Sequence, residues 1–300
     1  MDYGKIAGIA EKYGAKILFD ENIAKYTSFN IGGVCDAVVM PNSSECITEL
    51  ISCCKTAGIK YYVFGKCTNV LISDNGLRGV VIIIGSDHSG IKREGTHLIC
   101  DSGAPLSKIC GAAKNEGLCG LEFAYGIPGT AGGALYMNAG AYGGEMKDVV
   151  LYCDYLDSDG TVKRMENADM KLSYRHSVFC GSDKVILSVC FGLCEGNKDE
   201  IAAKMAETMQ KRRDKQPLEY PSAGSTFKRP EGHFAAKLIE DSGLKGFTVG
   251  GAQVSEKHSG FVINKGGATA ADVERLVEEI RKKVYADSGV MLETEILKVE

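Results

Sequence analysis

Glycine is concentrated in one short stretch of this 300-residue chain, between Gly126 and Gly144, where it fills seven of nineteen positions. Because glycine has no Cβ, its backbone can adopt φ > 0 and approach a ligand closely, so this segment could aim several N–H groups at phosphate oxygens. A run of tight turns would also explain the glycines. It would not explain why the residues between them are small, which indicates a flat cofactor lying against the main chain. These small residues are Ala131, Ala134, Ala139 and Ala141.

The composition is that of a globular protein that does not bind nucleic acid. A hydrophobic content of 44% is enough to bury a full core. A net charge of −4 and a pI near 5.8 argue against a nucleic-acid surface, which needs clustered Lys and Arg. The tightest basic cluster, residues 211–213, is typical of a helix end, where cations suit the helix dipole.

The chain is expected to be cytosolic, with reduced cysteines and no metal. Residues 1–5 begin no apolar signal segment, and no apolar run approaches the roughly 18 residues that a membrane span needs. Without a signal peptide, the twelve cysteines are interpreted as reduced core residues, as Cys46 and Cys54 are on an apolar helical face. Neither Cys-x-x-Cys nor His-Glu-x-x-His occurs, which argues against a metal site.

The order of apolar patterns predicts an α+β fold in three lobes. In the first lobe, residues 1–84, strand-like runs at 36–40, 61–64 and 80–84 enclose a helical pattern at 45–57. The second lobe, 85–195, is expected to hold a helix at 105–116, the glycine-rich segment and strands near 149–156 and 185–191. The third lobe is residues 196–300, with a return of 290–300 to the first lobe left open.

The last helix of the third lobe is predicted from about residue 270 to residue 285. Thr269 and Asp272 form a possible capping pair at its start. Its apolar stripe, which predicts core packing, consists of Val273, Leu276, Val277, Ile280 and Val284.

The two commonest nucleotide-binding motifs are absent from the sequence. Gly65-Lys66-Cys67-Thr68 fails as a P-loop because Thr68 comes one position late and no glycine lies five residues before Gly65. Gly126-x-x-Gly129-x-x-Gly132 fails as a Rossmann fingerprint because its first interval is wrong. What remains is two glycine-containing loops, 64–72 and 126–144, which could converge on one pyrophosphate.

At these residues the chain resembles the UDP-N-acetylenolpyruvoylglucosamine reductases, the MurB flavoenzymes of bacterial peptidoglycan synthesis. The resemblance spans nearly the whole chain, in blocks that follow one another in order. They are YTSFNIGG at 26–33, the 65–71 loop, the 126–144 segment, YRHSVF at 174–179, PSAGSTFKRP at 221–230, GGAQV at 250–254 and LETE at 292–295. The short interval from Tyr174 to Val185 makes it similar to the type II form, which lacks an extra substrate-covering loop.

The resemblance implies the flavin-binding fold shared with vanillyl-alcohol oxidase, the PCMH type. In this arrangement two α+β lobes hold FAD and a third α+β lobe binds the substrate. Cys67 and Thr130 differ from the commoner residues of their loops, but both are small. The residues implied to bind FAD are Asn30, Ile31, Gly32, Gly65, Lys66, Cys67, Thr68, Asn69, Val70, Leu71, Tyr125, Gly126, Pro128, Gly129, Gly132, Gly133, Asn138, Gly140, Ala141 and Tyr142.

Three positions match the catalytic residues of the family. The implied reaction reduces FAD with NADPH and then transfers hydride to the enolpyruvyl group of UDP-GlcNAc-enolpyruvate, which gives UDP-N-acetylmuramate. Ser225 would donate the proton, and the planar, permanently charged Arg175 would hold the substrate carboxylate. Glu295 would either act as a protonated carboxyl or orient Arg175, and Thr294 stands before it where the family usually has proline.

The remaining implications concern the substrate and the state of assembly. Tyr174, Lys215, Arg229 and His258 resemble substrate-binding positions, although Lys215 could equally be a helix-end charge and His258 a loop histidine. The expected partners are NADPH and the UDP-sugar, with no nucleic acid and no membrane insertion. A monomer or weak dimer is expected.

Two other functions fit parts of the same sequence. A flavin oxidase or dehydrogenase acting on another alcohol or sugar could use the same scaffold, since a fold does not fix a substrate. A non-catalytic FAD or UDP-sugar binding protein is the alternative from a different class. The presence of Ser225, Arg175 and Glu295 together argues against both.

Overall fold

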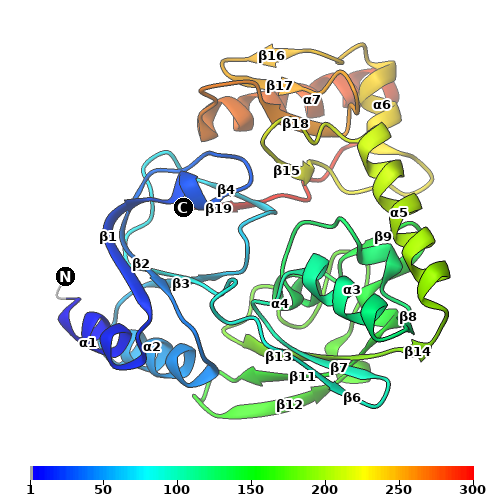
Figure 1. Cartoon of the computed structure of the whole chain (residues 1–300). Coiled ribbons are helices and arrows are strands. Elements are labelled where there is room, and N and C mark those ends of the chain that lie inside the picture. Colours follow the sequence, from blue (N-terminus) through cyan, green and yellow to red (C-terminus); the bar gives the residue numbers. More distant parts are fainter. Residues whose placement is uncertain (1–2) are drawn as a thin grey trace. The chain divides into compact units, whose positions relative to one another are not determined.

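The computed structural model describes residues 3–300 and has the mixed helix and strand content of an α+β protein (Figure 1), which confirms the predicted class. Met1 and Asp2, the first two of the residues 1–5 that were expected to begin no signal segment, lie outside the described residues. The helices are α1 (Gly4–Tyr13), α2 (Ser44–Thr56), α3 (Leu106–Asn115), α4 (Ala131–Tyr136), α5 (Lys198–Lys215), α6 (Ala235–Asp241) and α7 (Ala270–Ser288). The strands are β1 (Lys16–Asn22), β2 (Val34–Met40), β3 (Tyr61–Phe64), β4 (Val70–Ile72), β5 (Val80–Ile83), β6 (Ile91–Glu94), β7 (His97–Asp101), β8 (Leu118–Cys119), β9 (Gly140–Ala141), β10 (Gly144–Glu145), β11 (Val150–Leu156), β12 (Val162–Glu166), β13 (Val185–Gly192), β14 (Cys194–Glu195), β15 (Ser222–Ser225), β16 (Thr248–Val249), β17 (Ala252–Val254), β18 (Phe261–Asn264) and β19 (Leu297–Val299).

The chain divides into two compact units. Unit 1 consists of the residues up to Phe19 together with Ala37–Lys66 and Gly79–Lys211. Unit 2 consists of Asp20–Asp36, Cys67–Arg78 and Arg212–Glu300. The finer division into three lobes, at residues 84 and 195, stays a prediction.

A four-stranded sheet has the order β1-β2-β5-β3, and the core that includes its buried residues Ala37, Val39, Val80 and Ile82 lies in unit 1. Strands β2, β5 and β3 run parallel, and all four residues of β5 are buried, as is typical of a parallel strand covered on both faces. Helix α2 starts where the Ser43 hydroxyl accepts a hydrogen bond from the Cys46 backbone N–H at 3.1 Å. The predicted helical face, Ile47, Leu50, Ile51 and Cys54, is buried in the same core as Ile6 and Ala10 of α1.

A second sheet of unit 1 carries the glycine-rich segment. It has five antiparallel strands in the order β12-β11-β13-β7-β6. Alternate residues of β7, Leu98 and Cys100, point into a core that also contains residues of α3 and α4. Because α4 lies inside the glycine-rich segment, packing of α4 in this core holds that segment in place.

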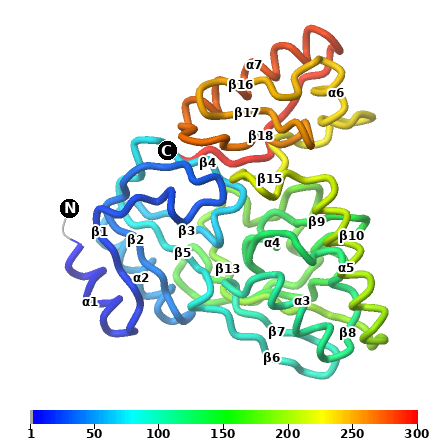
Figure 2. The backbone as a smooth tube through the Cα atoms, turned by 45° about the horizontal axis from the view of Figure 1, so that its top comes forward, coloured from blue at the N-terminus to red at the C-terminus, as the bar shows by residue number. Residues whose placement is uncertain are grey.

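Unit 2 is built on a sheet in the order β15-β18-β17-β16, with α6 and α7 packed beside it (Figure 2). The predicted apolar stripe of α7 is buried in this core, and the predicted pair of Thr269 and Asp272 forms a reciprocal capping box. Strand β19 near the C-terminus runs parallel to β4, with Lys298 opposite Leu71 (Figure 1). The C-terminal segment therefore joins the strand that follows the Gly65 loop.

No helix within residues 3–300 is both long and apolar enough to cross a bilayer.

Eight of the twelve cysteines are buried in the two units. Burial raises the pKa of the Cys54, Cys100 and Cys110 thiols to about 12, so these thiols stay protonated at neutral pH. A protonated thiol is a poor nucleophile, which suits a packing role for these side chains.

Replacing Asp272 with alanine should lower the free energy of unfolding at pH 7 by about 1 kcal/mol, the usual value of a helix cap. The Asp272 carboxylate accepts hydrogen bonds from the N–H groups of Thr269 and Gly251, and these bonds hold its pKa at about 2. Because the folded pKa is depressed, this contribution is present above about pH 4 and is lost as the pH falls towards 2. Urea unfolding at pH 7 and at about pH 2.5, followed by circular dichroism, measures it. Asp87→Ala at an exposed position is the control, and a loss that stays constant with falling pH would contradict the assignment.

Candidate active site

Backbone strain is concentrated at the residues that the sequence predicts for the site. Seven non-glycine residues within 3–300 have left-handed backbone, and five of them are predicted site residues. The five are Asn30 (φ 54°), Cys67 (φ 49°), Asn138 (φ 42°), Tyr142 (φ 52°) and Arg175 (φ 55°). Such a conformation costs about 1–3 kcal/mol per residue and persists only where the surrounding structure imposes it. The fold therefore holds these segments in particular conformations.

The two glycine-containing loops approach each other within unit 1. A Cβ on Gly65 would lie only 2.5 Å from the Thr130 hydroxyl oxygen, so any larger residue would displace that side chain. The same hydroxyl caps α4 by accepting a hydrogen bond from the Gly133 N–H at 3.3 Å. The two loops thus touch at Gly65 and Thr130, and their convergence on a pyrophosphate stays a prediction.

Packing against the protein itself accounts for several glycines of the 126–144 segment. A Cβ on Gly132 would come within 2.8 Å of the Ser102 Cβ, and one on Gly144 within 2.6 Å of the Phe123 ring. In the first turn of α4, the Ala131 and Gly132 N–H groups donate to the carbonyls of Ala104 and Ser102 at 2.9 and 2.8 Å. An anion bound by this segment would therefore be held by N–H groups outside that turn.

A tight two-residue turn carries Arg175 in unit 1. Ser173 and His176 exchange two backbone hydrogen bonds of 3.1 Å, which closes the turn around Tyr174 and Arg175. The half-buried Arg175 guanidinium donates to the Gly140 carbonyl at 3.4 Å and lies 4.9 Å from the centre of the Tyr174 ring. Arg175 and the β9 end of the glycine-rich segment are therefore neighbours.

Ser225 and Glu295 are brought together in unit 2 by backbone pairing. The Glu295 N–H donates to the carbonyl of Thr226, the residue after Ser225, at 2.8 Å, and Phe227 forms a bridge with Thr294. The Thr226 hydroxyl accepts a bond from the Val262 N–H at 2.9 Å and fixes this strand to β18. Both Ser225 and Glu295 are half-buried.

The C-terminal segment also joins the predicted flavin loop in unit 2. The Asn69 side-chain amide donates to the Glu295 carbonyl at 3.2 Å, and the Leu297 N–H donates to the Asn69 carbonyl at 3.0 Å. The Ser28 N–H donates to the carbonyl of Cys67 at 3.2 Å and ties the segment at 26–33 to the same loop. Burial raises the pKa of the Cys67 thiol to about 12, so this thiol is protonated.

The predicted FAD-binding residues are distributed over both units. Unit 1 contains Gly65, Lys66, Tyr125, Gly126, Pro128, Gly129, Gly132, Gly133, Asn138, Gly140, Ala141 and Tyr142. Unit 2 contains Asn30, Ile31, Gly32, Cys67, Thr68, Asn69, Val70 and Leu71. The backbone at these positions fits a flat, anionic cofactor. Left-handed residues and close-packed glycines present main chain there rather than bulky side chains.

Profiles of two protein families match this chain. The C-terminal domain of UDP-N-acetylenolpyruvoylglucosamine reductase matches residues 216–299, and an FAD binding domain matches residues 35–166. A UDP-N-acetylenolpyruvoylglucosamine reductase of Clostridium botulinum is 49% identical over 280 residues, which cover 93% of this chain and 91% of the relative. The chain belongs to this reductase family.

Two further comparisons agree with membership of the reductase family. The reductase of Caldanaerobacter subterraneus subsp. tengcongensis is 48% identical over 281 residues, or 94% of this chain and 93% of that protein. The crystal structure of the reductase from Thermus caldophilus superposes with a TM-score of 0.80 at 30% identity, over 95% of this chain and 99% of that chain. The resemblance identified from the sequence is confirmed.

The predicted substrate-binding residues lie in three places. Tyr174 is half exposed beside Arg175 in unit 1, whereas Lys215 and His258 both belong to unit 2. The exposed Arg229 lies in unit 2 with its guanidinium 4.0 Å from the centre of the Phe234 ring. Burial lowers the pKa of His258, and the positive charges of Lys215 and Lys245 lower it further.

Some residues that organise the site were not among the individually predicted site residues. Thr27 is one: its hydroxyl donates to the Ile31 carbonyl at 3.0 Å and closes the turn that holds Asn30 left-handed. A serine or threonine just before a glycine-containing turn is a signal that could have found it. Glu145, whose carboxylate accepts from the Asn138 amide at 2.6 Å, gave no such signal, because that contact exists only once β9 and β10 have paired.

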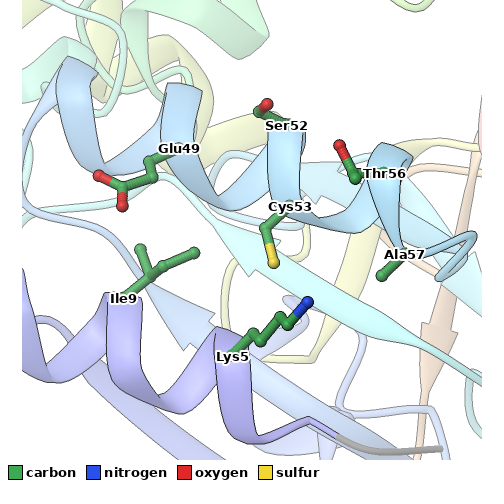
Figure 3. A pocket seen from close by; sticks show the side chains of 7 residues that line it. All are labelled: Lys5, Ile9, Glu49, Ser52, Cys53, Thr56 and Ala57. Carbon is green, nitrogen blue, oxygen red and sulfur yellow. The ribbon is translucent and has the colours of Figure 1, made fainter.

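A separate pocket of about 280 Å³ opens between α1 and α2 of unit 1 (Figure 3). Lys5 of α1 and Cys53 of α2 point into it from opposite helices (Figure 3). Its lining contains none of the predicted site residues, so the pocket is not part of the candidate active site. Within residues 3–300, no group of three or more His, Cys, Asp or Glu could hold a metal ion.

The His258 imidazole should titrate below the ordinary histidine pKa of about 6.5 and be neutral at pH 7. Burial disfavours its charged form first, and the ammonium groups of Lys215 and Lys245 add to this. An NMR titration of the histidine ring protons, with His258→Gln to assign the signal, measures the midpoint. Lys215→Gln should raise the midpoint without bringing it to 6.5, and a wild-type midpoint at or above 6.5 would contradict the packing described.

Proposed function

We propose that this chain is an NADPH-dependent flavoenzyme that reduces UDP-N-acetylenolpyruvoylglucosamine to UDP-N-acetylmuramate. Support comes first from relatives named as reductases of that compound, matched over nine-tenths of their length. The structural observation that carries the proposal is the backbone pairing that places Glu295 beside the strand of Ser225. Arg175, the third residue expected for this chemistry, is held in a defined turn.

The substrate has a carbon–carbon double bond conjugated to a carboxylate, and this determines what the protein must supply. When bound, FAD supplies the hydride, which it takes from NADPH. Addition of hydride to the methylene carbon leaves negative charge on the carbon that bears the carboxylate. That charge has enolate character, so the site has to stabilise it and then deliver a proton to the same carbon.

Arg175 suits the stabilising role. Its guanidinium is always cationic, and its planar fork matches the two oxygens of a carboxylate. The left-handed turn at Arg175 and its hydrogen bond to Gly140 restrict the side chain before substrate binds, so little conformational entropy remains to be lost. We propose that Arg175 binds the substrate carboxylate as it becomes enolate-like.

Ser225 suits the proton-donating role. A serine hydroxyl is a weak acid, but an enolate carbon is a strong enough base to take its proton when the hydroxyl is positioned. The resulting alkoxide would recover a proton from water. Ser225 lies at the end of β15, paired with Phe261 of β18, so its backbone is fixed by the sheet.

Glu295 is proposed to act in one of two ways. As a protonated carboxyl it would polarise the developing enolic acid, and as a carboxylate it would orient Arg175. Its backbone is held on both sides, by Thr226 through its N–H and by the Asn69 amide through its carbonyl. Either role places it in the second half of the reaction, after the flavin has been reduced.

The wider role follows from the reaction. UDP-N-acetylmuramate is a precursor of peptidoglycan, so the proposed process is cell-wall synthesis in the cytoplasm, with consequences for cell shape and division. The proposed FAD-binding residues are those of the two glycine-containing loops and of the segment at 26–33. Lys215, Arg229, His258 and Tyr174 are proposed to bind the UDP-sugar, and the enzyme is proposed to act as a monomer or weak dimer.

Ser225→Ala should separate the two half-reactions. Reduction of bound FAD by NADPH should proceed as in the wild type, whereas reoxidation by the enolpyruvyl sugar should slow by about 10²–10⁴-fold, the usual contribution of a positioned proton donor. Anaerobic stopped-flow absorbance at the flavin band measures both steps. Ser222→Ala, at the other end of β15, is the matched control and should leave both rates unchanged. Equal loss of both half-reactions in Ser225→Ala would exclude the proton-donor role.

A further inference from the structure

Asn138 is a fully buried polar residue that connects the glycine-rich segment to the turn of Arg175. It has no exposed surface and a left-handed backbone, with φ of 42°. Its side-chain nitrogen donates to the Glu145 carboxylate at 2.6 Å and to the Ser173 carbonyl at 2.9 Å. Its side-chain oxygen accepts from the Lys147 N–H at 2.9 Å. The amide thus joins three segments of unit 1.

These bonds occupy the polar groups of the Asn138 side chain. A carboxamide has two N–H hydrogens, and both are directed at protein oxygens, on Glu145 and Ser173. The remaining oxygen is engaged by Lys147. The side-chain amide is therefore used to hold the protein together, whatever the Asn138 backbone contacts.

The bond to Ser173 is the one that bears on the reaction. The Ser173 carbonyl accepts both this bond and the His176 N–H that closes the turn around Arg175. The guanidinium of Arg175 in turn donates to the carbonyl of Gly140, two residues after Asn138. Asn138 therefore fixes the turn at the base of Arg175 and, through its own backbone, the strand that receives the guanidinium.

We infer that Asn138 is a positioning residue that sets the Arg175 guanidinium for the substrate carboxylate. The inference rests on the proposed function for the identity of the carboxylate, but the linkage from Asn138 to the turn does not depend on it. A buried polar group is costly to leave without its hydrogen bond. Without the bond from the Asn138 amide to the Ser173 carbonyl, we therefore expect the turn around Arg175 to become mobile.

Asn138→Asp tests the linkage with little change in volume. The variant loses both N–H donors and faces the Glu145 carboxylate and the Ser173 carbonyl with negative charge. Asn138→Gly removes the side chain altogether and tolerates the left-handed backbone, so it is the second variant should the first fail to fold. Asn167→Asp is the matched control, since it loses two donors to the Lys147 and Val150 carbonyls in the same unit.

The decisive measurement is a double-variant comparison in the FAD-loaded enzyme. Each Asn138 variant should slow reoxidation of the reduced flavin by the enolpyruvyl sugar by about 10–100-fold, and Asn167→Asp by less than about twofold. Arg175→Ala combined with Asn138→Gly should be no slower than Arg175→Ala alone, because the two residues act through one group. Losses that multiply would show a general structural role and overturn the inference.

Hydrogen exchange supplies a readout that needs no turnover. In Asn138→Asp and Asn138→Gly, a peptide containing residues 173–178 should exchange faster than in the wild type, because the Asn138 amide no longer holds the Ser173 carbonyl that accepts from the His176 N–H. The same peptide should be unchanged in Asn167→Asp. Unchanged protection in both Asn138 variants would overturn the inference. If exchange is faster in the Asn138 variants but the wild-type enzyme does not reduce the sugar, the linkage stands and the proposed function is rejected.

Discussion

Left-handed backbone at non-glycine residues is the constraint on which the candidate site depends. Each such residue costs about 1–3 kcal/mol, and local hydrogen bonds have to offset that cost. The bonds are present here: the Thr27 hydroxyl closes the turn of Asn30, the Asn138 amide joins three segments, and Ser173 pairs with His176 around Arg175. The site is therefore a set of strained segments stabilised by polar contacts.

Other polar contacts connect residues that are proposed to act in different steps of the reaction. Asn69, expected at the flavin, donates to the carbonyl of Glu295, expected at the substrate. Arg175 donates to Gly140 of the glycine-rich segment. In each unit a segment proposed to bind the cofactor and a residue proposed to be catalytic therefore share a hydrogen bond. Such sharing would keep the flavin and the reacting double bond in register, which matters because hydride transfer requires close contact of the reacting atoms.

Patterns that repeat within a few residues could be predicted from the sequence. The buried faces of α2 and α7 and the capping box of Thr269 and Asp272 follow from helical periodicity and local hydrogen bonding. The pairing of Glu295 with Thr226 could not, because it joins segments almost seventy residues apart and no local pattern encodes it. The glycine content did not by itself distinguish a ligand-binding segment from a closely packed one, for a related reason. Gly132 and Gly144 are required by Ser102 and Phe123, and a sequence does not distinguish that from a close approach to a ligand.

The activity proposed for this chain is electron transfer from NADPH through FAD to an enolpyruvyl sugar. Anaerobic stopped-flow absorbance at the flavin band tests it most directly, with the purified FAD-loaded protein reduced by NADPH and then mixed with UDP-N-acetylenolpyruvoylglucosamine. Prompt reoxidation of the flavin by the sugar in the absence of oxygen is the expected result. A flavin that NADPH reduces but that only oxygen reoxidises would contradict it and indicate an oxidase on the same scaffold.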